Sequence, residues 1–269
     1  MKLSFTISAS PTRFAAVAQQ RDLRSSIEYL AGLGYEGVEL AIRDPAQVNL
    51  DEAAATASRV GVGVPAIGTG QAFLEEGMAL TAPEAGVREL AAARLEAQIE
   101  AARRFNAFVI IGLIHGPIPP QADRERAAEW LLAGLNRLAR RARAAGVRIV
   151  IEPVNRYESN WLNTVDEVLD LIERLGEDNV GVLPDTFHMN IEEADVFEAL
   201  RRAGSRFWHL HVADSNRRAP GCGHLDFNQI AVALAAQGYT GAVSAEILPY
   251  PTFEAAAAQT LRTMRPLIV

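Results

Sequence analysis

Cysteine is almost absent from this chain, which contains Cys222 and no other cysteine. A single thiol excludes an internal disulfide and a structural zinc site built on several cysteines. Lysine is equally scarce, because Lys2 is the one lysine and every other basic residue is arginine. Schiff-base catalysis therefore has a single candidate near the start of the chain, and the lysine of a phosphate-binding P-loop is missing.

Positive charge is also in deficit. The 26 basic residues stand against 33 acidic ones, which gives a formal net charge of −7. A field of this sign repels nucleic-acid backbones, so we expect no nucleic-acid partner. No apolar run approaches the ~18 residues of a membrane span, and the opening MKLSFTISASPTR does not resemble a signal peptide. We therefore expect a cytoplasmic protein that does not bind membranes.

Short runs rich in Val and Ile alternate with longer helical patterns along all 269 residues. Several runs are almost continuously apolar, as parallel strands covered on both faces are. This alternation predicts an α/β fold, with residues 1–269 forming one (β/α)8 TIM barrel. The expected strands are Leu3–Ile7, Gly37–Leu40, Gly63–Ile67, Ala107–Leu113, Arg148–Glu152, Val180–Leu183, Trp208–Val212 and Ala242–Ile247.

Apolar residues at helical spacing predict long helices over Glu84–Arg104 and Arg124–Ala145, the second stopped by Gly146. A doubly wound open sheet is the alternative to a barrel. It would need a glycine-rich phosphate turn after a strand, whereas the string GVGVPA from Gly61 to Ala66 opens one. The barrel is therefore favoured.

Four potential metal ligands close four successive predicted strands: Glu152, Asp185, His211 and Glu246. The carboxyl ends of barrel strands surround the active site, so these side chains should meet in the barrel mouth. Three carboxylates crowded there repel one another unless protons or a cation neutralise them. One imidazole with three carboxylates suits Mn²⁺, Co²⁺ or Mg²⁺, so we predict a divalent metal and no organic cofactor.

Further polar residues follow the same strands. Glu158, His188 and Arg217 lie on loops that rim the predicted mouth, although each also has an ordinary structural explanation. His209 alternates with His211 along one strand, and we expect it to face outward toward the helices. The pattern leaves open the roles of His115, Cys222 and His224.

Long strings around these residues resemble a known family. IEPVNRYE, DTFHMNIEEAD, HVADSNRRAPGCGHLDF and SAEIL are similar to the xylose-isomerase-like barrels of sugar isomerases and epimerases, and within them to the ketose 3-epimerases. ISAS, GYEGVELAIRDP and AIGTGQA look closer still to the 5-keto-L-gluconate epimerases, which act on keto-hexuronates. The resemblance covers essentially the whole chain.

The resemblance implies a metal-dependent epimerase, with Mn²⁺ as the first choice of metal, that inverts C3 of a ketose or keto-hexuronate through a metal-stabilised enediolate. Glu152 and Glu246 would serve as base and acid on opposite faces of the sugar, besides binding the metal with Asp185 and His211. Glu158, His188 and Arg217 would hydrogen-bond the oxygens at C1 to C3. The partner would be a small sugar or keto-sugar acid, and a homodimer or homotetramer is expected by analogy.

Three alternatives stay open at this point. The loop IGLIHGPIPP is proline-rich where a keto-uronate enzyme should be more basic, so a neutral ketose competes with a keto acid. An aldose–ketose isomerase would use the same enediolate and protonate it elsewhere. A hydrolase like endonuclease IV is disfavoured, because its three-zinc cluster needs more histidines than the five in this chain provide.

Overall fold

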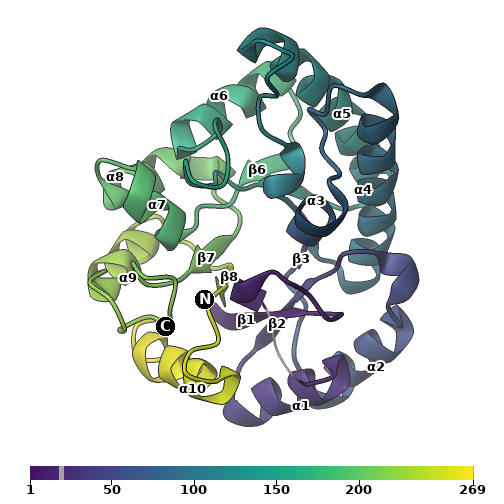
Figure 1. Cartoon of the computed structure of the whole chain (residues 1–269). Coiled ribbons are helices and arrows are strands. Elements are labelled where there is room, and N and C mark those ends of the chain that lie inside the picture. Colours follow the sequence, from purple (N-terminus) through teal and green to yellow (C-terminus); the bar gives the residue numbers. More distant parts are fainter. Residues whose placement is uncertain (18–20, 269) are drawn as a thin grey trace.

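The computed structural model, which describes residues 1–17 and 21–268, has eight parallel strands at its centre with helices around them (Figure 1). Each strand from β1 to β5 pairs with the next in the sequence, and β8 pairs with both β1 and β7. The strands are β1 (Lys2–Ser8), β2 (Gly37–Ala41), β3 (Ala66–Gly68), β4 (Phe108–Ile111), β5 (Ile149–Ile151), β6 (Val180–Val182), β7 (Leu210–Val212) and β8 (Ala242–Ala245).

The ring closes between β6 and β7. Two isolated parallel bridges join them, from Val182 to Phe207 and from Asp185 to His211. The predicted (β/α)8 TIM barrel is therefore confirmed, with β6–β7 as its most loosely paired seam. The second bridge also brings two predicted metal ligands side by side at the end of the barrel.

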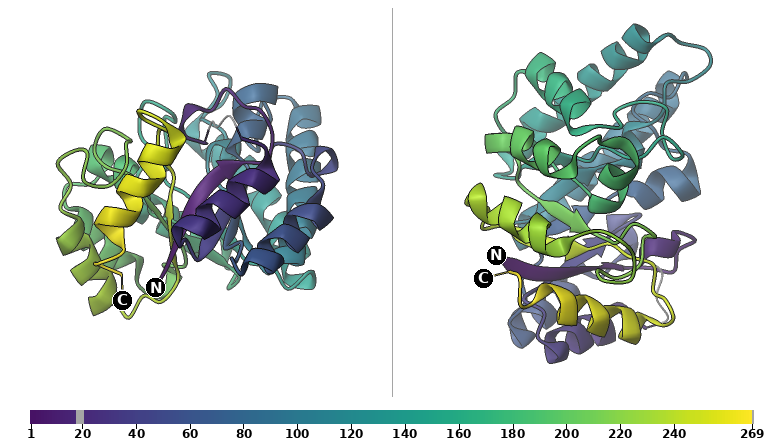
Figure 2. Two further views of the ribbon diagram at one scale, coloured as in Figure 1. Left: turned by 90° about the horizontal axis from the view of Figure 1, so that it is seen from below. Right: turned by 90° about the vertical axis from the view of Figure 1, so that its left-hand side faces the viewer.

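The helices form the outer layer of the barrel, and Figure 2 shows the last helix beside the first, as a closed ring requires. The α-helices are α1 (Leu23–Leu33), α2 (Leu50–Val60), α3 (Gly70–Glu76), α4 (Ala85–Phe105), α5 (Arg124–Ala144), α6 (Val165–Leu175), α7 (Thr186–Glu192), α8 (Val196–Ala203), α9 (Phe227–Ala236) and α10 (Phe253–Met264). The sequence predicted eight helical segments, and the difference arises because α3 and α7 are short additional helices directly after β3 and β6. Within the described part of the chain, no helix combines the length and apolar character that crossing a bilayer requires.

Local sequence explains where the long helices begin and end. The side chain of Asp123 accepts a hydrogen bond from the backbone N–H of Arg126 at 2.8 Å and so caps the start of α5. Leu131, Leu135 and Leu138 form the buried stripe of this helix. After its end, Gly146 adopts a φ of +69°, which a residue with a side chain rarely adopts.

The strands are shorter than the apolar runs predicted. Gly112 leaves the sheet after β4, and Leu113–His115 forms a 3₁₀ helix instead of extending the strand. Glu152 lies one residue past β5, although its backbone N–H still donates to the carbonyl of Ile111 at 3.0 Å. The chemically active side chains therefore stand at the barrel rim on backbone that the sheet still holds.

Glycine at position 181 is required by the seam between β6 and β7. A Cβ atom there would lie 2.4 Å from Cδ2 of Trp208 and 2.8 Å from the backbone oxygen of Arg206. We expect Gly181→Ala to lower the free energy of unfolding by about 1–3 kcal/mol through overpacking, as measured by urea denaturation. Gly32→Ala in α1 is the matched control, because nothing lies within 4 Å of its added Cβ. Equal stability of the two variants would contradict the prediction.

Candidate active site

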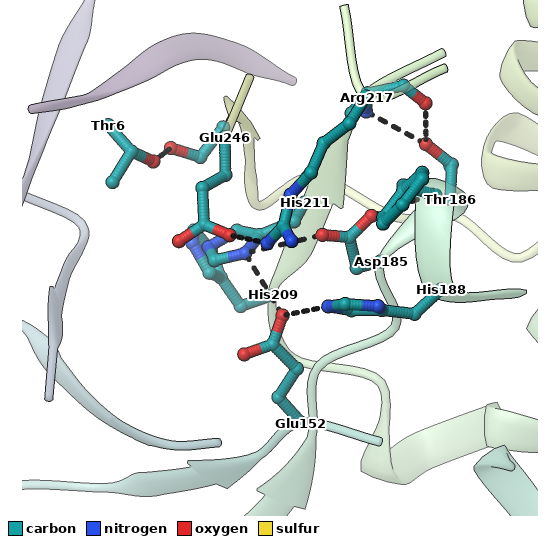
Figure 3. A network of polar contacts seen from close by, with 12 residues as sticks. Thr6, Glu152, Asp185, Thr186, His188, His209, His211, Arg217 and Glu246 are labelled. Atoms are coloured by element: carbon teal, nitrogen blue, oxygen red, sulfur yellow. Dashed lines mark hydrogen bonds and ion pairs between the residues drawn. The ribbon is translucent and has the colours of Figure 1, made fainter. Parts of the chain in front are cut away.

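The four predicted metal ligands meet in the barrel mouth (Figure 3). Glu152 follows β5, Asp185 caps the start of α7 after β6, His211 lies in β7 and Glu246 follows β8. Each is buried, and each offers one ligand atom that lies within 4.8 Å of the other three. We call these four residues the ligand cluster.

Three atoms of the ligand cluster have no hydrogen-bond partner among the described residues. They are Oε1 of Glu152, Oδ2 of Asp185 and Nδ1 of His211. The imidazole nitrogen lies 3.4 Å from the Glu152 oxygen and 4.0 Å from the Asp185 oxygen. Buried polar atoms are rarely left unpaired, and oxygen with imidazole nitrogen is a donor set that divalent cations favour. The residues therefore fit a divalent metal and form a candidate metal site.

Glu39, in the middle of β2, orients the imidazole of His211. The Nε2 atom of His211 lies 2.9 Å from Oε1 of Glu39, which is fully buried. This contact keeps a proton on Nε2, so when the ring is neutral the lone pair of Nδ1 is directed toward the ligand cluster. The sequence search missed Glu39 because it considered only strand ends. A lone carboxylate inside an apolar strand was the available signal, since such a charge needs a partner.

His209 corrects one expectation from the sequence. Its Nε2 atom lies 2.6 Å from Oε2 of Glu39, and its side chain has no exposed surface. It therefore faces the barrel interior with His211 rather than outward toward the helices (Figure 3). The physical reason is the strand repeat, because residues two apart on a strand point to the same face.

Arg217 links the predicted substrate-binding residues to the ligand cluster. Its guanidinium donates to Glu158 at 2.8 Å and to Glu246 at 3.1 Å. The rings of Phe187 and Phe14 flank it, with centroids 5.0 and 5.3 Å from its central carbon. The arginine is thus held in one position at the mouth, with two carboxylates and two rings around it.

His188 has its protonation pattern fixed by a neighbouring loop. The backbone N–H of Asn155 donates to Nδ1 of His188 at 3.3 Å, so Nδ1 is an acceptor and the proton of the neutral ring is on Nε2. That Nε2 atom faces Oε1 of Glu152 at 3.9 Å. The side chain of Asn155 also donates to Glu158 at 2.9 Å. One asparagine therefore orients two of the three predicted substrate-binding residues.

The three residues with open roles lie elsewhere. His115 is buried with Nδ1 2.6 Å from the carbonyl of Gly116, and burial lowers the pKa of its imidazole to about 4. His224 and Cys222 are exposed on the loop after β7. None of the three lines the pocket at the barrel mouth.

Charge crowding shifts the proton affinities of the cluster. Burial, with the nearby charges of Glu152 and Asp185, raises the pKa of Glu246 to about 8 against the opposing effect of His211 and Arg217. Burial lowers the pKa of His211, but the charges of Glu39, Glu152 and Glu246 outweigh it and leave this pKa well above its usual value. Without a metal, both side chains therefore hold a proton at neutral pH.

Metal binding should displace these protons. Glu246 and His211 have pKa values above neutrality in the metal-free protein, and a cation needs both groups deprotonated. We expect a release of between about one and two protons near pH 7, and a Mn²⁺ affinity that is still rising with pH where Glu246 titrates, at about pH 8. Calorimetric titration in two buffers of different ionisation enthalpy measures this release. Identical binding enthalpies in both buffers would contradict it.

Glu39 should influence metal affinity without touching the metal. Glutamine has one acceptor oxygen where glutamate has two, so Glu39→Gln cannot accept hydrogen bonds from both His209 and His211 in the present arrangement. The His211 ring then loses its fixed orientation. We expect Mn²⁺ affinity to fall by about 10–100-fold in calorimetric titration. Glu129→Gln, the same change on the exposed face of α5, is the control and should bind like the parent. Unchanged affinity in Glu39→Gln would show that His211 is oriented by the backbone alone.

Comparison with known proteins identifies the family. Residues 27–267 match the family described as xylose isomerase-like TIM barrel. The chain is 33% identical to L-ribulose 3-epimerase of Mesorhizobium japonicum, over 87% of this chain and 78% of the relative. It is also 33% identical to D-psicose 3-epimerase of Agrobacterium fabrum, over 82% and 77%. A solved structure of an L-ribulose 3-epimerase superposes with a TM-score of 0.86 at 28% identity, covering 99% of this chain and 94% of that one.

These relatives confirm the prediction that the chain is an enzyme of the isomerase class, an epimerase. They also confirm the resemblance to ketose 3-epimerases inferred from the strings around the ligand cluster. The chain belongs to the xylose isomerase-like TIM barrel family.

Proposed function

We propose that this protein inverts the C3 centre of an open-chain ketose with the help of a divalent cation, Mn²⁺ in the first place. The observation that carries the proposal is the convergence of Glu152 and Glu246 with two further ligand-type residues around buried, unpaired atoms. The relatives named L-ribulose 3-epimerase and D-psicose 3-epimerase support a ketose as the substrate class. The proposal therefore rests on both the geometry of the ligand cluster and the 3-epimerase activity for which these relatives are named.

Glu152, Asp185, His211 and Glu246 would hold the cation. When bound, it would polarise the C2 carbonyl and stabilise the negative charge of an enediolate. Three carboxylates and one imidazole form an oxygen-rich set that suits Mn²⁺ better than a thiolate-selective metal. The finding that Glu246 and His211 carry protons in the metal-free protein agrees with a site that needs added positive charge.

Glu152 and Glu246 would exchange the proton at C3. They come from β5 and β8, and they enter the mouth from opposite sides of His211 (Figure 3). A sugar between them presents one face to each carboxyl group, so one removes the C3 proton and the other returns a proton on the opposite face. Inversion needs this two-sided arrangement, since a single base would return the proton to the face it came from.

Arg217, His188 and Glu158 would hold the oxygens at C1 to C3. The guanidinium of Arg217 keeps its charge, because the carboxylates of Glu246 and Glu158 raise its pKa although burial lowers it. The Nε2–H of His188 is the donor left free by the contact of Nδ1 with Asn155. Two donors beside the developing oxyanion and one carboxylate to orient a hydroxyl are a suitable set for enolisation.

Three further expectations remain part of the proposal. Residues 1–269 would act as one domain, the enzyme would work in the cytoplasm, and it would associate into a dimer or tetramer.

Aldose–ketose isomerisation is the competing reaction, because the same enediolate yields that product when protonated at another carbon. A nuclease like endonuclease IV is disfavoured, because its three-zinc cluster needs several histidines close together. The described residues contain two groups of metal-ligand type, which share His211, and neither group includes His115 or His224.

The position of solvent label tests the reaction. In D₂O with Mn²⁺, we expect deuterium to enter C3 of a ketohexose as its C3 epimer forms, read by NMR. Glu246→Gln should lower kcat by about 10²–10⁴-fold at saturating Mn²⁺, because the general acid or base is lost. Glu129→Gln is the control with the same chemical change far from the mouth.

Two outcomes would count against this proposal. Deuterium at C1 or C2 without label at C3 would assign the aldose–ketose isomerase reaction instead. Near-normal turnover of metal-loaded Glu246→Gln would remove Glu246 from proton transfer, and metal loading must therefore be measured on the same sample by atomic absorption.

A further inference from the structure

The pocket at the barrel mouth has two chemically different sides. Its ionisable lining residues all belong to the ligand cluster or to the predicted substrate-binding set and lie within or after strands β5 to β8: they are Glu152, Glu158, His188, His211, Arg217 and Glu246. The opposite side comes from the ends of β2, β3 and β4. Among the described residues lining that side, none carries a charge, and its largest side chains are those of Gln71, Ile110 and Leu113. We call it the neutral side.

Gln71 lines the neutral side and carries a hydrogen-bond acceptor without a partner among the described residues. The residue is 1% exposed, and its Oε1 atom has no partner among the described residues. Its Nε2 atom donates to Oγ of Ser8 at 2.7 Å. Because Ser8 Oγ donates its own proton to the carbonyl of Ser10, it can only accept from the glutamine amide. The amide orientation is therefore fixed, and the unpaired atom of Gln71 is its oxygen.

Thr69 adds a second acceptor. Its hydroxyl donates to the carbonyl of Ile110 at 2.7 Å, so only oxygen lone pairs remain for a ligand. Thr69 is buried and lines the same side of the pocket as Gln71. A ligand group bound to these two side-chain oxygens must supply a proton. A hydroxyl has one to donate, whereas a carboxylate at neutral pH has none.

The basic residues nearest in sequence to the neutral side supply no unpaired positive charge to it. Arg43, after β2, is paired with Glu75 at 2.7 Å and with Glu76 at 3.4 Å. His115, after β4, is buried and neutral at physiological pH, because burial lowers its pKa to about 4. Arg13 is exposed and is not among the residues that line the pocket. A ligand carboxylate on the neutral side would thus be desolvated without a counter-charge.

We propose that Gln71 is a specificity-determining residue that accepts a hydrogen bond from a hydroxyl on the distal carbons of the substrate, so that the enzyme takes neutral ketoses and rejects keto-hexuronates. This inference rests on the proposed C3 epimerisation, since it assumes that C1 to C3 lie on the charged side. It decides between the two substrate classes that the sequence left open. The distal end of the sugar, where a hexuronate carries its carboxylate, then meets the side-chain acceptors of Gln71 and Thr69 and no charged side chain.

A matched pair of substrates tests the substrate class with the unaltered protein. D-Fructose and the keto-hexuronate of the same configuration differ only in a distal hydroxymethyl or carboxylate group. With Mn²⁺ in D₂O, we expect kcat/KM for C3 exchange to be at least about 100-fold higher for the neutral sugar. A keto-hexuronate that reacts as well or better overturns the inference, and loss of that preference in Arg13→Gln would identify the counter-charge responsible. Absence of C3 exchange with both sugars would instead refute the proposed function.

A variant tests the residue itself. Gln71→Met keeps the length of the side chain and removes the acceptor, and we expect kcat/KM for the neutral ketohexose to fall by about tenfold, mainly through KM. This loss should disappear for one of the three ketohexoses that lack the hydroxyl at C4, C5 or C6, because the partner of Gln71 is then already missing. The melting-temperature increase produced by Mn²⁺ should equal that of the parent, which shows an intact ligand cluster.

Gln98→Met is the matched control. Gln98 on α4 is fully buried and its Oε1 is also unpaired, but it does not line the pocket. The control should leave the discrimination among the three deoxy sugars unchanged. A Gln71→Met protein with parental KM, or one that loses the same factor on every deoxy sugar, overturns the assignment of Gln71. If Gln71→Met does not fold, the comparison of the two natural substrate classes still decides the inference.

Discussion

Repulsion among buried carboxylates is the constraint on which the mouth of this barrel depends. Glu152, Asp185 and Glu246 offer oxygens within 4.8 Å of one another and of the His211 nitrogen. Negative charges this close and this buried cannot all persist without compensation. In the metal-free protein the compensation is a proton on Glu246 and one on His211, together with the guanidinium of Arg217. A divalent cation supplies the same charge and pairs the atoms that are otherwise unpaired.

The register of the strands places the ligand cluster at the barrel mouth and aligns the interior residues that hydrogen-bond to one another beneath it. Thr6 lies beside Glu39 in the β1–β2 pair, and Ser244 lies beside His211 in the β7–β8 pair. Hydrogen bonds from Thr6 to Glu39 and between Thr6 and Ser244 join these strands in the barrel interior. Glu39 remains ionised despite its burial, because the charge of His211 and the hydrogen bonds from both histidines lower its pKa. The interior carboxylate is therefore stable only with the two imidazoles, which ties the position of one ligand to four strands.

The sequence was sufficient to predict the barrel and the four residues of the ligand cluster, because parallel strands place whatever follows their carboxyl ends at one rim. The same rule could not find Glu39, because this residue lies inside β2 and not at its end. His209 was predicted to face outward although it lies two residues before His211 on the same strand and therefore shares its face. Helices α3 and α7 were not predicted, since seven residues carry too little periodicity to identify a helix. Gln71 gave no signal in the sequence, because its role depends on an amide orientation that Ser8, 63 residues away, determines.

The separation of charged and neutral sides divides two tasks between different loops. Proton exchange at C3 needs residues whose proton affinities are tuned by one another, and these all come from β5 to β8 and the loops that follow them. In the proposed reaction the distal carbons would be recognised by acceptors and shape at the ends of β2, β3 and β4, which line the pocket. Changes on the neutral side are far less coupled to the electrostatics of the ligand cluster, because uncharged groups alter the field at the metal site very little. A barrel of this design would therefore change the sugar it accepts while the proposed chemistry at C3 is preserved, and substrate class would be decided by residues such as Gln71 rather than by the metal ligands.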